Sequence, residues 1–150
     1  MALSADRNTA RAAGDVLVQG MAASVLVYAG ALVMRNAAGY LTKGATATGS
    51  VGVGRAEERK TGGANAGDEK LKVRPGSYWF KNSTSTDAIT VAEIGDVCFI
   101  VDDEQVAKTN GTNTRSPAGF VEDVDATKGV LVRFDEVLTR SYVEGIANPA

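Results

Sequence analysis

The chain has 150 residues, of which 44% are apolar and 23% charged; it carries a formal net charge of −2, one cysteine and no histidine. A globular chain of this length forms one domain and buries enough surface to need neither disulfides nor a structural metal. Zinc sites and histidine-dependent catalytic triads are excluded, because the sequence lacks their ligands and bases. Carboxylate, lysine or oxygen-ligand chemistry is left, or no chemistry at all.

The charges also argue against nucleic acid as a partner. Sixteen basic residues are interleaved with 18 acidic ones, and the isoelectric point is near 5.2. Nucleic-acid-binding domains usually have an isoelectric point above about 9 and clustered cations. We therefore expect no direct contact with nucleic acid.

Residues 1–14 are small and polar and show no periodicity, which predicts an extended N-terminal arm. The uncharged stretch 16–34 is long enough for a transmembrane helix. Its glycines, Gly20 and Gly30, instead divide it into runs of strand length at 15–19, 24–28 and 31–35. We expect short strands there and no contact with a membrane.

Short apolar runs then alternate with turn residues along the chain. Asn36–Gly39 predicts a hairpin between 31–35 and 40–43. In the strand predicted within 50–59, Gly52 and Gly54 indicate a bulge or a close backbone neighbour. The glycine-rich segment 61–68 predicts a mobile loop.

Further strands follow in the second half of the chain. Residues 70–74 alternate charged and apolar side chains, as a half-buried strand does, whereas 97–101 is a continuous apolar run typical of a strand covered on both faces, with Cys98 buried. Asn110–Gly111 predicts a hairpin with positive φ at both positions. Residues 130–134 predict a last strand, and 135–143 a single short helix.

The predicted fold is mainly β, a compact small sandwich or barrel of short antiparallel strands with an extended N-terminal arm. We place the arm at 1–14, the β-rich domain at 15–138 and a C-terminal tail at 139–150.

None of the candidate chemical motifs has the spacing that its chemistry requires. The glycines of 49–54 lack the strand-to-helix context and the lysine of a phosphate loop. The acidic clusters 102–104 and 122–125 do not reproduce a calcium loop, and we interpret them as turn residues. A structural Ca²⁺ and a carboxylate-dependent hydrolase remain alternatives. Our principal prediction assigns no catalytic residue, no metal site and no cofactor.

An ordered set of motifs covers most of the chain from about residue 6 to residue 134. Its members are 53–58 (VGRAEE), 62–67 (GGANAG), 73–83 (VRPGSYWFKNS), 87–90 (DAIT), 94–95 (IG), 98–103 (CFIVDD), 106–109 (VAKT), 114–119 (TRSPAG) and 123–125 (DVD). In this order they resemble the head decoration proteins, or capsid cement proteins, of tailed Mu-like bacteriophages. Residues 135–150 extend beyond the resemblance.

The resemblance implies a virion structural protein and not an enzyme. Such a protein binds the outer surface of the expanded capsid lattice, cements neighbouring major capsid protein subunits and stabilises the DNA-filled head. Its expected location is the outside of the virion, and the host cytoplasm during assembly. The resemblance also implies self-association, with a trimer expected first and a dimer second.

Two segments are the candidates for binding the capsid. The arm could add a strand to a sheet edge of a capsid subunit, and the glycine-rich loop could become ordered on the lattice. The candidate residues are Arg7, Asn8, Thr9, Arg11, Gly62, Gly63 and Asn65. The alternative function is a carbohydrate- or receptor-binding β-module on the virion surface, in which Tyr78, Trp79 and Phe80 would form an exposed stacking platform.

Overall fold

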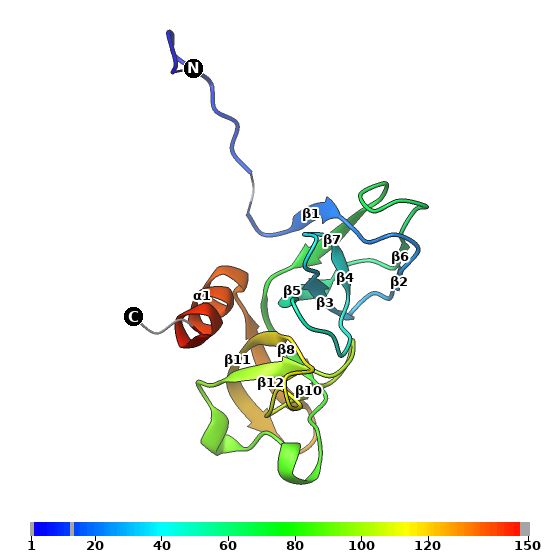
Figure 1. The fold of residues 1–150 in the computed structure, drawn as a ribbon, viewed down its shortest axis with the longest axis vertical. Coiled ribbons are helices and arrows are strands. Elements are labelled where there is room, and N and C mark those ends of the chain that lie inside the picture. Colours follow the sequence, from blue (N-terminus) through cyan, green and yellow to red (C-terminus); the bar gives the residue numbers. More distant parts are fainter. Residues whose placement is uncertain (1, 13, 148–150) are drawn as a thin grey trace.

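The computed structural model describes residues 2–12 and 14–147, and the fold of these residues is mainly β (Figure 1). The strands are β1 (Leu17–Gly20), β2 (Leu26–Val27), β3 (Leu32–Arg35), β4 (Leu41–Lys43), β5 (Val51–Ala56), β6 (Lys60–Thr61), β7 (Lys70–Arg74), β8 (Gly76–Phe80), β9 (Val97–Ile100), β10 (Val106–Ala107), β11 (Pro117–Asp125) and β12 (Gly129–Phe134). The helices are the short 3₁₀ turns η1 (Ser85–Asp87) and η2 (Val91–Glu93) and the α-helix α1 (Glu136–Ala147).

The strands form two five-stranded antiparallel sheets and one two-stranded sheet. The first sheet has the order β1-β7-β5-β3-β4, the second has the order β10-β9-β11-β12-β8, and β2 pairs with β6. Each large sheet curls, so that its edge strands approach at an isolated bridge, Met21 with Leu41 in the first and Lys81 with Gln105 in the second. Within the described residues no barrel closes, and the arrangement is compatible with a small sandwich, which confirms the predicted fold class.

The apolar run at 16–34 is confirmed as strand structure, since it contains β1, β2 and all but the last residue of β3. The Asn36–Gly39 hairpin is also confirmed: β3 and β4 pair across it, and Asn36 accepts hydrogen bonds from the backbone N–H groups of Ala38 and Tyr40. In the part of the chain that is described, no helix has the length and apolar character needed to cross a membrane.

The core is divided into two clusters of buried side chains. One cluster lies within the first sheet and includes Val33, Leu41 and Leu71. The other cluster joins Leu32 and Met34 of β3 to the inward side chains of the second sheet. Strand β3 therefore contributes to both clusters and holds the two sheets together.

The glycines of β5 allow backbones to approach closely, as predicted. A Cβ atom on Gly52 would lie 2.1 Å from the carbonyl oxygen of Ala118 in β11, and a Cβ on Gly54 would lie 2.4 Å from that of Arg74. A register shift between Val33 and Met34 of β3, opposite Gly54 and Gly52, places a bulge there. The two sheets therefore come into backbone contact at Gly52 of β5, which faces Ala118 of β11.

The predicted helix is present, but the predicted C-terminal tail is wrong in its boundary. Helix α1 spans Glu136–Ala147, so the division between 138 and 139 falls inside it. The helix contacts β11 and β5, and Thr139 is fully buried. Residues 139–147 therefore belong to the domain, whereas 148–150 lie outside the described residues.

Candidate binding surfaces

The N-terminal arm leaves the body of the molecule just before β1 and extends away from both sheets (Figure 1). Residues 2–12 contain no helix or strand, and all of them are exposed. The candidates Arg7 and Thr9 are linked by one local backbone hydrogen bond, from Thr9 N–H to Arg7 O at 3.0 Å. The arm also carries Leu3, whose relative exposure is 75%. Its side chains are thus free to contact another molecule.

The predicted glycine-rich loop is present, and its first residues hydrogen-bond to the body. Gly62 N–H donates to Val25 O at 2.8 Å, and Ser24 N–H donates to Gly63 O at 2.9 Å. Asn65 N–H donates to the Asp68 carboxylate at 2.9 Å. A Cβ on Gly62 would lie 2.1 Å from Ala22 O, so this glycine is required for packing. Of the three candidates in the loop, Asn65 is exposed and the two glycines are partly buried.

The structure does not bring the arm and the loop together. Strand β1 pairs with β7 from Leu17 opposite Val73 to Gly20 opposite Lys70. The arm enters at the Leu17 end, and the loop leads into the Lys70 end. At about 3.3 Å per residue, the two ends are about 10 Å apart along the ladder. The candidates therefore form two separate surfaces.

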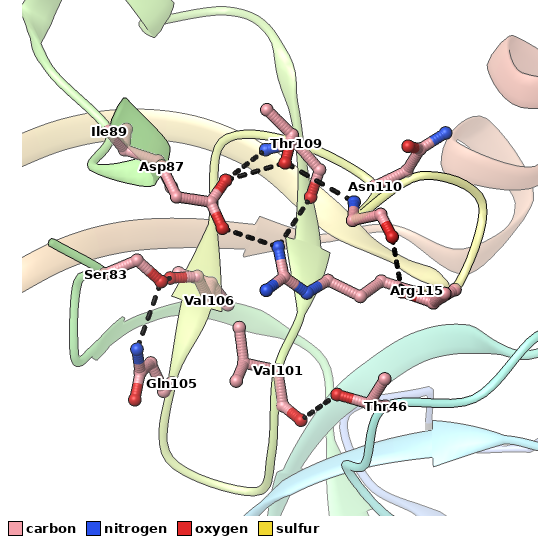
Figure 2. Close-up of polar contacts among 12 residues, drawn as sticks. Thr46, Ser83, Asp87, Ile89, Val101, Gln105, Val106, Thr109, Asn110 and Arg115 are labelled. Carbon is pink, nitrogen blue, oxygen red and sulfur yellow. Dashed lines mark hydrogen bonds and ion pairs between the residues drawn. The ribbon is translucent and has the colours of Figure 1, made fainter. Parts of the chain in front are cut away.

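A polar cluster that the sequence did not reveal fixes the loops between β10 and β11 (Figure 2). Arg115 Nη1 lies 2.6 Å from Asp87 Oδ2 and also donates to Thr109 O. Thr109 donates to Asp87 through both its hydroxyl and its backbone N–H. Burial raises the pKa of Asp87, but the hydrogen bonds from Thr109 and Arg115 outweigh it and hold this pKa below its ordinary value. The cluster spans 28 positions of sequence, which no local pattern indicates.

The predicted hairpin at Asn110–Gly111 is wrong. Strands β10 and β11 flank β9 instead of pairing with each other. Positive φ angles occur at Gly111 (63°), Thr112 (59°) and Asn113 (64°), which form a left-handed turn. The Asn110 side chain bonds to both the backbone and the side chain of Asn113, and this local bonding, together with Arg115, replaces the hairpin geometry.

The 102–104 cluster lies in the turn between β9 and β10, as predicted, whereas 122–125 lies within the C-terminal end of strand β11, and only its last residue bonds to the turn that follows. Asp102 accepts a hydrogen bond from Glu104 N–H, and Asp125 accepts from Thr127 N–H and Lys128 N–H. These backbone donors lower the pKa of Asp125. Among the described residues, no group of three or more acidic or cysteine side chains is arranged to hold a metal ion.

The aromatic residues of β8 do not form a single stacking platform. Phe80 is buried and packs edge-on against Phe134, and Tyr78 lies on the same side. Trp79 points to the opposite face, where the Lys128 ammonium lies 5.3 Å from its ring centroid. The three-ring surface that a carbohydrate-binding module would use is therefore absent from β8.

Comparisons with protein-family models, with curated proteins and with solved structures found no match to this chain.

Proposed function

We propose that this chain is a capsid cement protein: it binds the outside of the expanded head of a tailed bacteriophage and links neighbouring major capsid protein subunits. The proposal rests on the ordered motifs that resemble head decoration proteins. The structural observation that supports it best is the arm, an exposed segment of small polar residues with two arginines that extends away from the body.

The chemistry of cementing fits a protein of this composition. A cement needs a complementary surface and no reactive group, and it stabilises the mature lattice by binding that state in preference to the immature one. Each copy that contacts two or more capsid subunits makes the release of one subunit depend on several linked contacts. The arm would supply one of these contacts by adding a strand to a sheet edge of a capsid subunit.

The test is direct decoration of heads. Purified protein is mixed with expanded, undecorated heads of a Mu-like phage and imaged by electron microscopy. Ordered density on the outer surface of the lattice is the expected result. Heads that remain bare at saturating protein would overturn the proposal.

The role of the arm is tested by deleting residues 2–12 and, separately, by the double substitution Arg7→Ala/Arg11→Ala. Both changes should weaken binding to heads and leave thermal unfolding unchanged, because the arm is exposed along its whole described length. Lys70→Ala/Lys72→Ala is the matched control, since it removes two exposed positive charges from β7. Equal binding by all three variants would show that the arm is not a contact.

A further inference from the structure

The outward side of the second sheet is lined by large apolar side chains. Its register places Phe120 opposite Val97 and Leu131 opposite Trp79. The neighbouring residues in each strand point into the core. The outer apolar face, as we call it, consists of the partly buried side chains of Trp79, Val97, Phe99, Phe120 and Leu131.

An antiparallel sheet with one face in water normally has polar residues on that face. Strand β7 of the first sheet follows this rule, because it presents Lys70, Lys72 and Arg74 outward. The second sheet does not follow it. The apolar run at 97–101 is typical of a strand covered on both faces, yet Val97 and Phe99 are only partly buried.

Helix α1 covers a part of this face and extends its apolar surface. The Tyr142 ring packs edge-on against Phe120, with 5.7 Å between centroids. Leu138, one turn earlier, and Tyr142 are themselves 45% and 46% exposed. The helix thus leaves an apolar flank of its own beside the sheet. Both surfaces offer apolar area to a partner.

We propose that a second copy of this chain covers the outer apolar face, which is the self-association surface of the protein. The charges on this face support this partner. Arg133 lies opposite Phe120, and Asp123 lies opposite Leu131, so a cation and an anion stand diagonally across an apolar centre. A surface that carries both signs in this arrangement is complementary to a rotated copy of itself, with Arg133 of one copy meeting Asp123 of the next.

Both charged groups are available for such a contact. The Arg133 side chain is 53% exposed, and its guanidinium is 3.8 Å from Asp135, at the long end of an ion pair. The Asp123 carboxylate accepts a hydrogen bond from the adjacent Val124 N–H and is exposed. Aromatic residues and arginine are enriched in protein interfaces, and a two-fold contact between identical subunits uses the same patch on both of them.

This surface is separate from the arm, which starts from the first sheet, so both can be occupied at once. The proposal therefore goes beyond capsid binding and is tested on the isolated protein. Analytical ultracentrifugation over a range of concentrations should give masses that are multiples of 15.5 kDa. The single tryptophan, Trp79, lies on the face, and its emission should shift to the blue as the protein associates.

Substitutions assign the association to this face. Leu131→Asp should convert the protein to a monomer, whereas Val18→Asp, a matched change at a half-exposed residue of the first sheet, should leave the association intact. Asp123→Arg and Arg133→Asp should each raise the dissociation constant by about tenfold or more. The double variant Asp123→Arg/Arg133→Asp should restore association, because each copy again offers both charges.

Three results would overturn the proposal. The first is a wild-type chain that stays a 15.5 kDa monomer at all concentrations, with constant Trp79 emission. The second is an oligomer that survives Leu131→Asp or is lost equally in Val18→Asp. The third is a wild-type chain that is a monomer and binds heads, with a Leu131→Asp variant that does not bind them. The outer apolar face would then contact the capsid and not a second copy. A cooperative thermal unfolding transition shows that each variant is folded. If the wild-type protein forms the oligomer but does not bind heads, the result counts against the proposed function and not against the self-association surface.

Discussion

Arg35 and Glu136, which are 101 positions apart in sequence, form a two-pronged ion pair between the first sheet and helix α1. Arg35 Nε lies 2.6 Å from Glu136 Oε2, and Nη2 lies 3.1 Å from Oε1. The same guanidinium donates to the Gln19 side chain at 2.6 Å. Both partners are largely shielded, with about a fifth of each side chain exposed. This pair holds the first turn of α1 on the end of β3.

We expect Arg35→Ala to destabilise the protein by about 1–3 kcal/mol, because it removes the two-pronged partner of the partly buried Glu136 carboxylate and leaves it only the more exposed contact with Arg140. Urea unfolding measures the change. Arg140→Ala is the control, since Arg140 makes an exposed contact with the same carboxylate at 3.3 Å and should contribute at most about 0.5 kcal/mol.

Hydrogen exchange locates the effect of Arg35→Ala. The amides of α1 should lose protection more than those of β12, because the helix is released locally while the sheet is retained. Equal loss of protection in both elements would contradict a local role for the Arg35–Glu136 pair.

The Asp87 cluster should make stability depend on pH in the acid range. The pKa of Asp87 is lowered in the folded protein, so folding favours the carboxylate. Its contribution is fully present above the unfolded value of about 3.9 and is lost as the pH falls through the lower folded pKa. The melting temperature of the wild type should therefore fall below about pH 4.

Asp87→Asn separates this group from the other carboxylates that titrate. The variant should be less stable than the wild type at pH 7, because it weakens the contact with Arg115. Its melting temperature should also fall less steeply between pH 5 and about pH 3. Parallel curves for variant and wild type would show that Asp87 does not link protonation to folding.

Local sequence patterns predicted the strands and one turn well. Alternation identified β7 and β12, and the glycine pattern of β5 correctly indicated a close backbone neighbour, because these features follow from the side chains of a single segment. The arm is visible in the sequence for the same reason, as a segment without periodicity. Such a segment does not reveal what it contacts, because a partner adds no pattern to the chain.

The features that sequence reasoning missed depend on residues far apart. The Asn110–Gly111 pattern favours a hairpin, but the Asp87–Arg115 pair and the Asn110–Asn113 contacts select a left-handed turn. The glycines of the 61–68 segment predict a mobile loop. In the structure its first glycines hydrogen-bond to the segment before β2, which its composition does not indicate. Composition indicates which conformations a segment can adopt on its own. The conformations of this turn and this loop depend on contacts with residues elsewhere in the chain.

Gly52→Ala tests the contact between the two sheets. The added methyl would lie 2.1 Å from Ala118 O, a backbone atom that cannot move without shifting β11. We expect a loss of about 3 kcal/mol or a failure to fold. Gly39→Ala is the control: its Cβ meets no atom within 4 Å, and its cost should be about 1 kcal/mol, from the positive φ of 95°. Similar costs in urea unfolding would contradict the close approach of β5 and β11.

Cys98 should be unreactive in the folded protein. It is fully buried in β9, and burial raises the pKa of its thiol to about 12, so the nucleophilic thiolate is almost absent at pH 8. An aromatic disulfide reagent should label the native chain only as fast as the core opens, and should label the urea-unfolded chain within minutes. The double variant Cys98→Ala/Ser141→Cys places a thiol on the exposed side of α1 and should react rapidly in the native state. Equally rapid labelling of native wild-type protein would show that β9 is accessible and that the core cluster around Cys98 is not closed.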